Sequence, residues 1–168
     1  MTPGDGELRA AAEAALAAVG AAGGTLATAE SLTGGLIGAC VTAVPGASAV
    51  YRGGVVSYAT GAKSGLLGVP ADLLAREGAV HPDVAAAMAE GARSALAAGF
   101  GLAVTGVAGP EPQDGNPVGR VYAAVAVRGA ATRVECFDLD GGRDAVRRAT
   151  ALLALRALTR AAAPDRPQ

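Results

Sequence analysis

Aromatic residues, cysteine and histidine are scarce in this sequence. Phe, Trp and Tyr make up 3% of the 168 residues and tryptophan is absent, so alanine, valine and leucine must fill the core. One histidine and two cysteines, Cys40 and Cys136, cannot build a Cys/His metal cluster, and no CxxC spacing occurs. We expect no metal site, and two reduced, buried thiols.

The chain also lacks a strong net charge and a long apolar run. With 14 basic and 15 acidic residues the formal net charge is −1, so no basic footprint indicates nucleic acid. Glycine or charge breaks each apolar run, which argues against a membrane span, and the N-terminus lacks the basic region of a signal peptide. We expect a cytoplasmic protein with neither nucleic acid nor a membrane as partner.

Lysine is the rarest charged residue. Lys63 is the only lysine among the 14 basic residues. Arginine stays protonated in proteins, whereas a partly desolvated lysine can lose its proton and act as a base. The chain can therefore have kept Lys63 for this chemistry, although a genomic preference for arginine with one surface lysine left over explains the count equally well.

What is present is an alternation of helical and strand patterns. Apolar spacing with glycine and proline stops predicts helices over 7–22, 34–44, 60–67, 70–76, 82–98 and 142–159. Runs typical of strands cover 54–58 and 100–105, a shorter one covers 25–29, and a hairpin joins 118–127 to 132–137. These elements predict a three-layer α/β/α fold with a mixed, mostly parallel sheet. The 51% hydrophobic content suffices for one domain, with a core over about 7–160 and a frayed tail over 161–168.

Ser31 is expected where a strand turns into a helix, and Gly34 and Gly35 follow three and four residues later, after Thr33. Free N–H groups at a helix start can bind a developing oxyanion, and glycines let a carbonyl approach the backbone. Ser31 is therefore a candidate nucleophile, and Thr33, Gly34 and Gly35 are candidate oxyanion or substrate ligands. A Ser31 or Thr33 that only caps the helix would have the same surroundings.

A nucleophilic serine needs a base. The only histidine, His81, precedes a helix that begins at Pro82, where a capping or exposed role is expected. Lys63 is the alternative base, and Tyr58 lies at the expected end of the preceding strand, at the sheet edge expected to carry Ser31. Neutral Lys63 can take the Ser31 proton while the Tyr58 hydroxyl orients or relays it. A half-buried strand tyrosine explains Tyr58 equally well.

Ligand-binding positions are expected in the loop after the strand that ends at Thr105. Its Gly106 and Gly109 suit contact with a ribose or phosphate, although a glycine-rich turn without a ligand explains them nearly as well. The loop matches neither GxGxxG nor a P-loop, so no dinucleotide or ATP site is predicted.

Three arginines lie at the start of the last predicted helix. Arg143 would be a phosphate ligand there, because the helix dipole and the guanidinium act together. Arg147 and Arg148 are expected on a solvated face, with Arg148 paired to Asp144.

Several segments occur together in order: 28–35 (TAESLTGG), 45–48 (PGAS), 56–58 (VSY) with Lys63, 67–69 (LGV), 78–80 (GAV), 105–110 (TGVAGP) and 117–119 (PVG). From about residue 26 to 158 the chain resembles the CinA C-terminal domain family. That family includes nicotinamide-nucleotide amidases, which convert nicotinamide mononucleotide and water to nicotinate mononucleotide and ammonia in pyridine nucleotide salvage.

The resemblance implies Ser31 as nucleophile, Lys63 as its base and Tyr58 as the third member, with an acyl-enzyme and no cofactor. It also implies a small-molecule nucleotide substrate and a homodimer or higher homo-oligomer. Two positions depart from the family pattern: Ala59 stands where Asn or Ser is common, and His81 where Ser is common.

Two other functions fit the sequence. One is a Ser/Lys amidase that acts on another small amide. The other is a non-catalytic nucleotide-binding accessory module, against which the presence of both Ser31 and Lys63 argues.

Overall fold

A computed structural model describes residues 1–163 and shows a five-stranded sheet in the order β2-β1-β3-β4-β5. The strands are β1 (Leu26–Glu30), β2 (Tyr51–Val56), β3 (Phe100–Gly106), β4 (Arg120–Val127) and β5 (Arg133–Asp138). Strand β1 pairs in parallel with β2 and β3, whereas β4 is antiparallel to both of its neighbours. The sheet is therefore mixed, as predicted, with parallel and antiparallel pairings in equal number.

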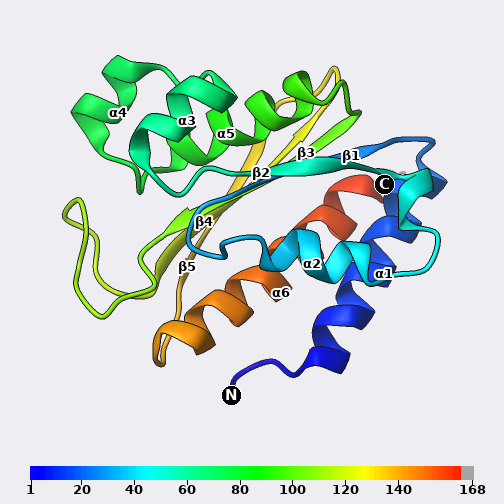
Figure 1. The fold of residues 1–168 in the computed structure, drawn as a ribbon, viewed down its shortest axis with the longest axis horizontal. Helices are drawn as coiled ribbons and strands as arrows, with labels where there is room; N and C mark the ends of the chain where they lie inside the picture. The colour runs from blue at the N-terminus through cyan, green and yellow to red at the C-terminus, as the bar shows by residue number, and fades with distance from the viewer. Residues whose placement is uncertain (164–168) are drawn as a thin grey trace, which may run out of the picture.

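Helices cover both faces of this sheet (Figure 1). One face carries α1 (Asp5–Ala21), α2 (Leu36–Thr42) and α6 (Arg143–Ala162). The other carries α3 (Thr60–Leu67), α4 (Ala71–Glu77) and α5 (Pro82–Ala95). A short 3₁₀ turn, Ala47–Ala49, leads into β2. The predicted three-layer α/β/α architecture is thus confirmed.

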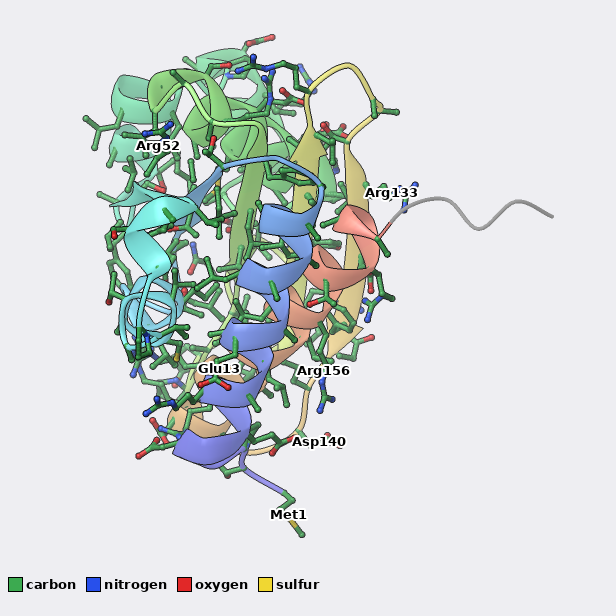
Figure 2. The ribbon with its side chains drawn as sticks, turned by 90° about the vertical axis from the view of Figure 1, so that its right-hand side faces the viewer. Met1, Glu13, Arg52, Arg133, Asp140 and Arg156 are labelled. Atoms are coloured by element: carbon green, nitrogen blue, oxygen red, sulfur yellow. The ribbon has the colours of Figure 1, made fainter. Side chains whose placement is uncertain are left out.

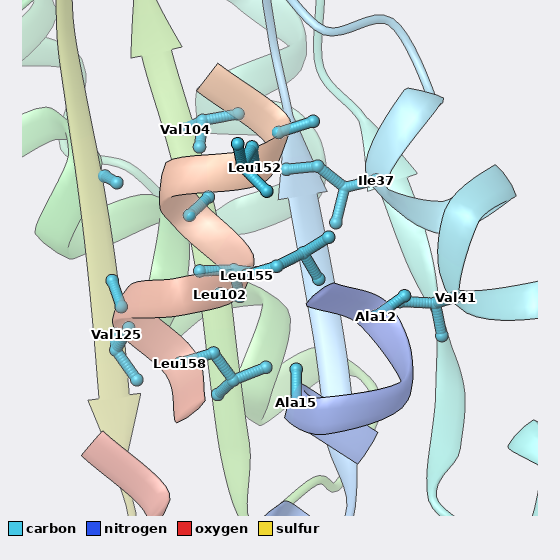
Figure 3. Packing of buried hydrophobic residues seen from close by; sticks show 14 of the residues in the cluster. Ala12, Ala15, Ile37, Val41, Leu102, Val104, Val125, Leu152, Leu155 and Leu158 are labelled. Atoms are coloured by element: carbon cyan, nitrogen blue, oxygen red, sulfur yellow. The ribbon is translucent and has the colours of Figure 1, made fainter. Parts of the chain in front are cut away.

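The larger of two apolar clusters lies between α1, α2, α6 and the sheet. Figure 3 shows leucines of α6 meeting β3 and β4 side chains, with small alanines of α1 beside them. On the opposite face α5 packs so tightly that a methyl group on Gly101 of β3 would collide with the carbonyl oxygen of Ala89. Small residues therefore replace aromatic bulk by bringing backbones close together.

Among the charged side chains of residues 1–163, only Glu30 and Lys63 are buried. Figure 2 shows Glu13 on α1, Arg156 on α6 and Arg133 on β5 pointing away from the core. None of the helices described is both long enough and apolar enough to cross a membrane.

Several predicted boundaries shift in the structure. Helix α2 begins at Leu36 instead of residue 34, because Gly34 and Gly35 have positive φ angles of 61° and 98° that a helix does not allow. Strand β2 begins and ends earlier than expected, since its register with β1 runs from Tyr51 to Val56. Tyr58 consequently lies beyond the strand.

Two further expectations need correction. Helix α6 continues through residues 161 and 162, which were assigned to a frayed tail, because Ala162 packs into the core; the rest of that tail, 164–168, lies outside the described residues. Cys136 is exposed and Cys40 only half-buried, so the two free thiols are not core residues. Cys136 lies on edge strand β5, where its side chain faces outward.

Candidate active site

Ser31 follows the last residue of β1 at the carboxyl edge of the parallel strands. Its N–H donates to the carbonyl oxygen of Val104 at 3.2 Å, which extends the pairing of β1 with β3 by one residue. The Ser31 side chain is 9% exposed and lines a pocket at this edge. The serine is therefore held by a central strand while its hydroxyl faces the cavity.

Lys63 reaches Ser31 from the first turns of α3. Its Nζ donates to Ser31 Oγ at 3.0 Å and to the carbonyl oxygen of Ser57 at 2.7 Å. The side chain is 1% exposed, and this burial lowers the pKa of Lys63 from 10.5 to about 8, against the opposing effect of the Asp114 carboxylate. The structure thus brings together the serine and the lysine that the sequence singled out, and burial makes the lysine easier to deprotonate.

Tyr58 takes a different place from the one expected. It is not a half-buried strand residue, because it is 59% exposed in the loop after β2. Its hydroxyl accepts a hydrogen bond from Arg143 at 2.7 Å, and no hydrogen bond joins it to Ser31 or Lys63 in the described structure. Tyr58 is therefore a rim residue of the pocket in this conformation.

Arg143 crosses the pocket mouth from the start of α6. One of its amino groups bonds Tyr58, and another donates to the carbonyl oxygen of Gly109 at 2.7 Å. The guanidinium is exposed beside the opening, as expected of a residue that meets a charged ligand.

The pocket is built from segments far apart in the sequence. Its lining comprises Ser31, Leu32, Tyr58, Thr60, Lys63, Ala79, Val80, Thr105, Gly106, Val107, Ala108, Gly109, Glu111, Gln113 and Arg143. No group of three His, Cys, Asp or Glu side chains that could hold a metal occurs among residues 1–163. The pocket offers a serine hydroxyl and a buried amine, and its lining also includes Tyr58, Glu111 and Arg143.

Thr105 and the two loop glycines line the pocket but have structural partners. The Thr105 hydroxyl donates to the carbonyl oxygen of Ala79 at 2.7 Å, which fixes the opposite wall. A methyl group on Gly106 would strike the backbone of β4, and Gly109 has a φ of 86°. The fold alone therefore accounts for glycine at both positions.

The turn after Ser31 differs from the predicted oxyanion site. The N–H of Gly34 donates to the Ser31 carbonyl oxygen at 3.1 Å, and the N–H of Gly35 donates to Glu30 Oε2 at 3.0 Å. Neither is free to bind an oxyanion. The N–H of Leu32, by contrast, forms no hydrogen bond within residues 1–163, and Leu32 lines the pocket.

Thr33 is buried in that turn. Its Oγ1 lacks a hydrogen-bond partner within the described chain, and so does the buried Oγ of Ser57. Thr33 does not line the pocket, so its predicted contact with substrate has no support in the geometry.

The expectation for Arg147 and Arg148 is wrong. Arg147 is half-buried and donates to the carbonyl oxygens of Leu32 and Thr33 at 3.1 and 2.8 Å. Arg148 pairs with Asp5 of α1 rather than with Asp144. Both arginines serve tertiary contacts because α6 lies between α1 and the turn after β1.

His81 has the capping role that was expected. Its Nδ1 accepts a hydrogen bond from the N–H of Asp83 at 3.2 Å at the start of α5. The departure at Ala59 leaves α3 without a side-chain cap at its first position.

Asp114 and Asn116 were not singled out from the sequence. Asp114 Oδ2 accepts from the N–H of Ala79 at 2.8 Å, and Asn116 Nδ2 donates to the carbonyl oxygen of Val80 at 2.9 Å. Together they tie the long loop to the pocket wall. The Asp-Gly pair signals a turn, but nothing in the local sequence indicates which distant backbone the turn contacts.

Comparison with known proteins identifies the family. The profile of the CinA C-terminal domain matches residues 8–162. The chain belongs to the CinA C-terminal domain family. It is 32% identical to a CinA superfamily protein from Klebsiella pneumoniae, whose crystal structure superposes with a TM-score of 0.88 over 92% of this chain and 97% of that one. It is 38% identical to the competence/damage inducible protein CihA of Agrobacterium tumefaciens. The crystal structure of that protein superposes with a TM-score of 0.86 over 94% of this chain and 96% of that one.

Longer CinA-like proteins also match. The chain is 51% identical over 124 residues to one from Frankia casuarinae, covering 73% of this chain and 28% of that protein. It is 48% identical over 129 residues to one from Myxococcus xanthus, covering 75% and 30%. This CinA-family chain therefore spans about 30% of the length of such relatives.

Proposed function

We propose that this CinA-family domain is a serine amidohydrolase in which Ser31 is the nucleophile and Lys63 its general base. The observation that carries the proposal is the 3.0 Å contact between Lys63 Nζ and Ser31 Oγ inside a pocket. Burial brings the pKa of Lys63 to about 8, so the amine can exist without a proton near neutral pH.

Four proton movements complete the reaction. Neutral Lys63 takes the Ser31 proton as Oγ attacks the amide carbon, and then gives it to the nitrogen that leaves as ammonia. Lys63 next takes a proton from the water that attacks the acyl-enzyme, and returns it to Ser31 as the acid departs. The N–H of Leu32, the residue after the nucleophile, supplies a donor for the oxyanion of both tetrahedral intermediates.

The proposed substrate is nicotinamide mononucleotide. Its carboxamide would lie against Ser31, and its phosphate would replace Tyr58 and Gly109 as the partner of Arg143. This substrate is supported by the resemblance to nicotinamide-nucleotide amidases and by the arginine at the mouth of the pocket.

The test is to measure ammonia and nicotinate mononucleotide released from nicotinamide mononucleotide. Ser31→Ala and Lys63→Ala should each lower kcat by about a hundredfold or more. Ser94→Ala, on the exposed end of α5, is the matched control and should retain the parent rate.

A folded parent without turnover would refute the substrate. Labelling of Ser31 by a fluorophosphonate would then indicate an amidase for another small amide. Nucleotide binding without labelling would indicate an accessory module.

A further inference from the structure

Glu30, the residue before Ser31, is a buried carboxylate bound entirely by backbone. It is 2% exposed, and its oxygens accept from the N–H groups of Gly35, Ile37 and Gly38 at 3.0, 3.0 and 2.8 Å. A buried carboxylate is costly unless charge-assisted hydrogen bonds compensate it. Three such bonds tie the end of β1 to the start of α2, on either side of the nucleophile.

Backbone hydrogen bonds also connect Glu30 to Lys63 through Ser57. Its carbonyl oxygen accepts from the N–H of Ser57 at 2.8 Å. The carbonyl oxygen of Ser57 in turn accepts from Lys63 Nζ at 2.7 Å. A displacement of Glu30 would therefore move both members of the Ser31–Lys63 pair.

Arg147 holds the same turn from the other side. Its guanidinium spans the carbonyl oxygens of Leu32 and Thr33, while the Ser31 carbonyl oxygen accepts from Gly34. In a trans peptide the N–H points opposite to the carbonyl. Holding these three carbonyls consequently fixes the direction of the N–H groups of Leu32 and Thr33.

We propose that Glu30 and Arg147 are positioning residues that clamp the turn over 31–35, so that Ser31 Oγ stays on Lys63 and the Leu32 N–H stays free for the oxyanion. The inference rests on the proposed role of Ser31 as nucleophile. A serine or aspartate cap at the start of α2 would stabilise the helix alone. A buried glutamate from the preceding strand and an arginine from α6 also fix the turn that precedes the helix.

The purpose of such a clamp is precision. A displacement of about 1 Å between reacting groups can cost about a hundredfold in rate. Gly34 and Gly35 make this turn intrinsically adaptable, so bonds from outside must define its shape.

The test uses Glu30→Gln and Arg147→Lys in the full chain. Glutamine replaces one acceptor oxygen by an amide NH₂ that faces backbone donors, and lysine keeps the charge but presents a single point donor instead of a fork. Glu13→Gln and Arg156→Lys, two surface residues in exposed ion pairs, are matched controls.

Three quantities are measured: the rate of Ser31 labelling by a fluorophosphonate, kcat and KM for nicotinamide mononucleotide per titrated active site, and Tm. We expect both clamp variants to lose about ten- to a hundredfold in labelling rate and kcat, with KM changed less than about threefold. The controls should match the parent. A purely structural role would lower Tm and the number of active sites but leave kcat per site unchanged.

Folded clamp variants that are labelled and turn over at the parent rate would overturn the inference. If Glu30→Gln fails to fold, Glu30→Asp and Arg147→Lys decide in its place. A parent that is neither labelled nor active refutes the proposed function and the clamp together, whereas a reactive parent with equally reactive variants refutes the clamp alone.

Discussion

At the level of single residues, the site depends on an amine that burial shifts toward its neutral form. Lys63 and Ser31 could be identified from the sequence because lysine is otherwise absent and because the serine precedes two glycines. Arg147 could not, since its partners, the carbonyl oxygens of Leu32 and Thr33, are more than a hundred positions away. Helical periodicity describes which face a residue occupies but not which backbone that face meets.

The pH profile tests the state of Lys63. We expect kcat/KM to rise with pH and to level off above about 8, because only the neutral amine accepts the Ser31 proton. Asp114→Asn removes the carboxylate that raises the pKa of Lys63, so the midpoint should move to lower pH. Ammonia release between about pH 6 and pH 10 measures both profiles. If Asp114→Asn leaves the midpoint of the kcat/KM profile unchanged, the titrating group is not Lys63.

Arg143 is predicted to recognise the phosphate. Arg143→Ala should raise KM for nicotinamide mononucleotide by about ten- to a hundredfold, the value of a charge-assisted hydrogen bond. Nicotinamide riboside, which lacks the phosphate, should be hydrolysed equally by parent and variant. Arg133→Ala, an exposed arginine on β5, is the control. An equal loss on both substrates would contradict a phosphate contact.

At the level of elements, the sequence predicted every helix and strand of the core, but several of their ends lie elsewhere in the structure. The α3 boundaries matched because local signals suffice there, whereas β2 was misplaced because its pairing with β1 sets its ends. The long loop was expected to bind ligand, but its attachment through Asp114 and Asn116 depends on tertiary contacts. Local propensity cannot report such contacts.

The contact of α5 with β3 leads to a prediction about packing. Gly101→Ala places a methyl group on the Ala89 carbonyl oxygen, and we expect it to lower the free energy of unfolding by about 1–3 kcal/mol. Gly65→Ala, where open space surrounds the new methyl group in α3, should instead stabilise by up to about 1 kcal/mol. Urea unfolding measures both. Equal stability of the two variants would refute the tight packing of α5.

At the scale of the whole molecule, the burial of Lys63 lowers the stability of the fold. Lys63 is among the largest fully buried side chains, and its Nζ donates to the Ser31 hydroxyl and the Ser57 carbonyl oxygen, both of which are uncharged. Neither hydrogen-bond partner of Lys63 Nζ in the described structure is a carboxylate. The proposed function and the stability of the fold therefore make opposite demands on this position.

The pH dependence of unfolding makes that conflict measurable. The unfolded chain keeps the Lys63 proton up to its ordinary pKa of 10.5, and the folded chain only up to about 8. In this window the unfolded state binds more protons, so rising pH stabilises the parent relative to Lys63→Met, by up to about 1.4 kcal/mol per pH unit. Lys63→Met should accordingly have the higher Tm at pH 7. A difference in stability that stays constant from pH 7 to 10.5 would contradict the lowered pKa.

Lys63 is both buried and the only lysine of the sequence, which has a practical consequence for NMR spectroscopy. Protein grown on isotope-labelled lysine carries one labelled side chain, and that side chain touches Ser31. A single NMR resonance then reports the protonation of Lys63, without assignment, in the free protein, with nucleotide bound and after Ser31 is labelled by a fluorophosphonate.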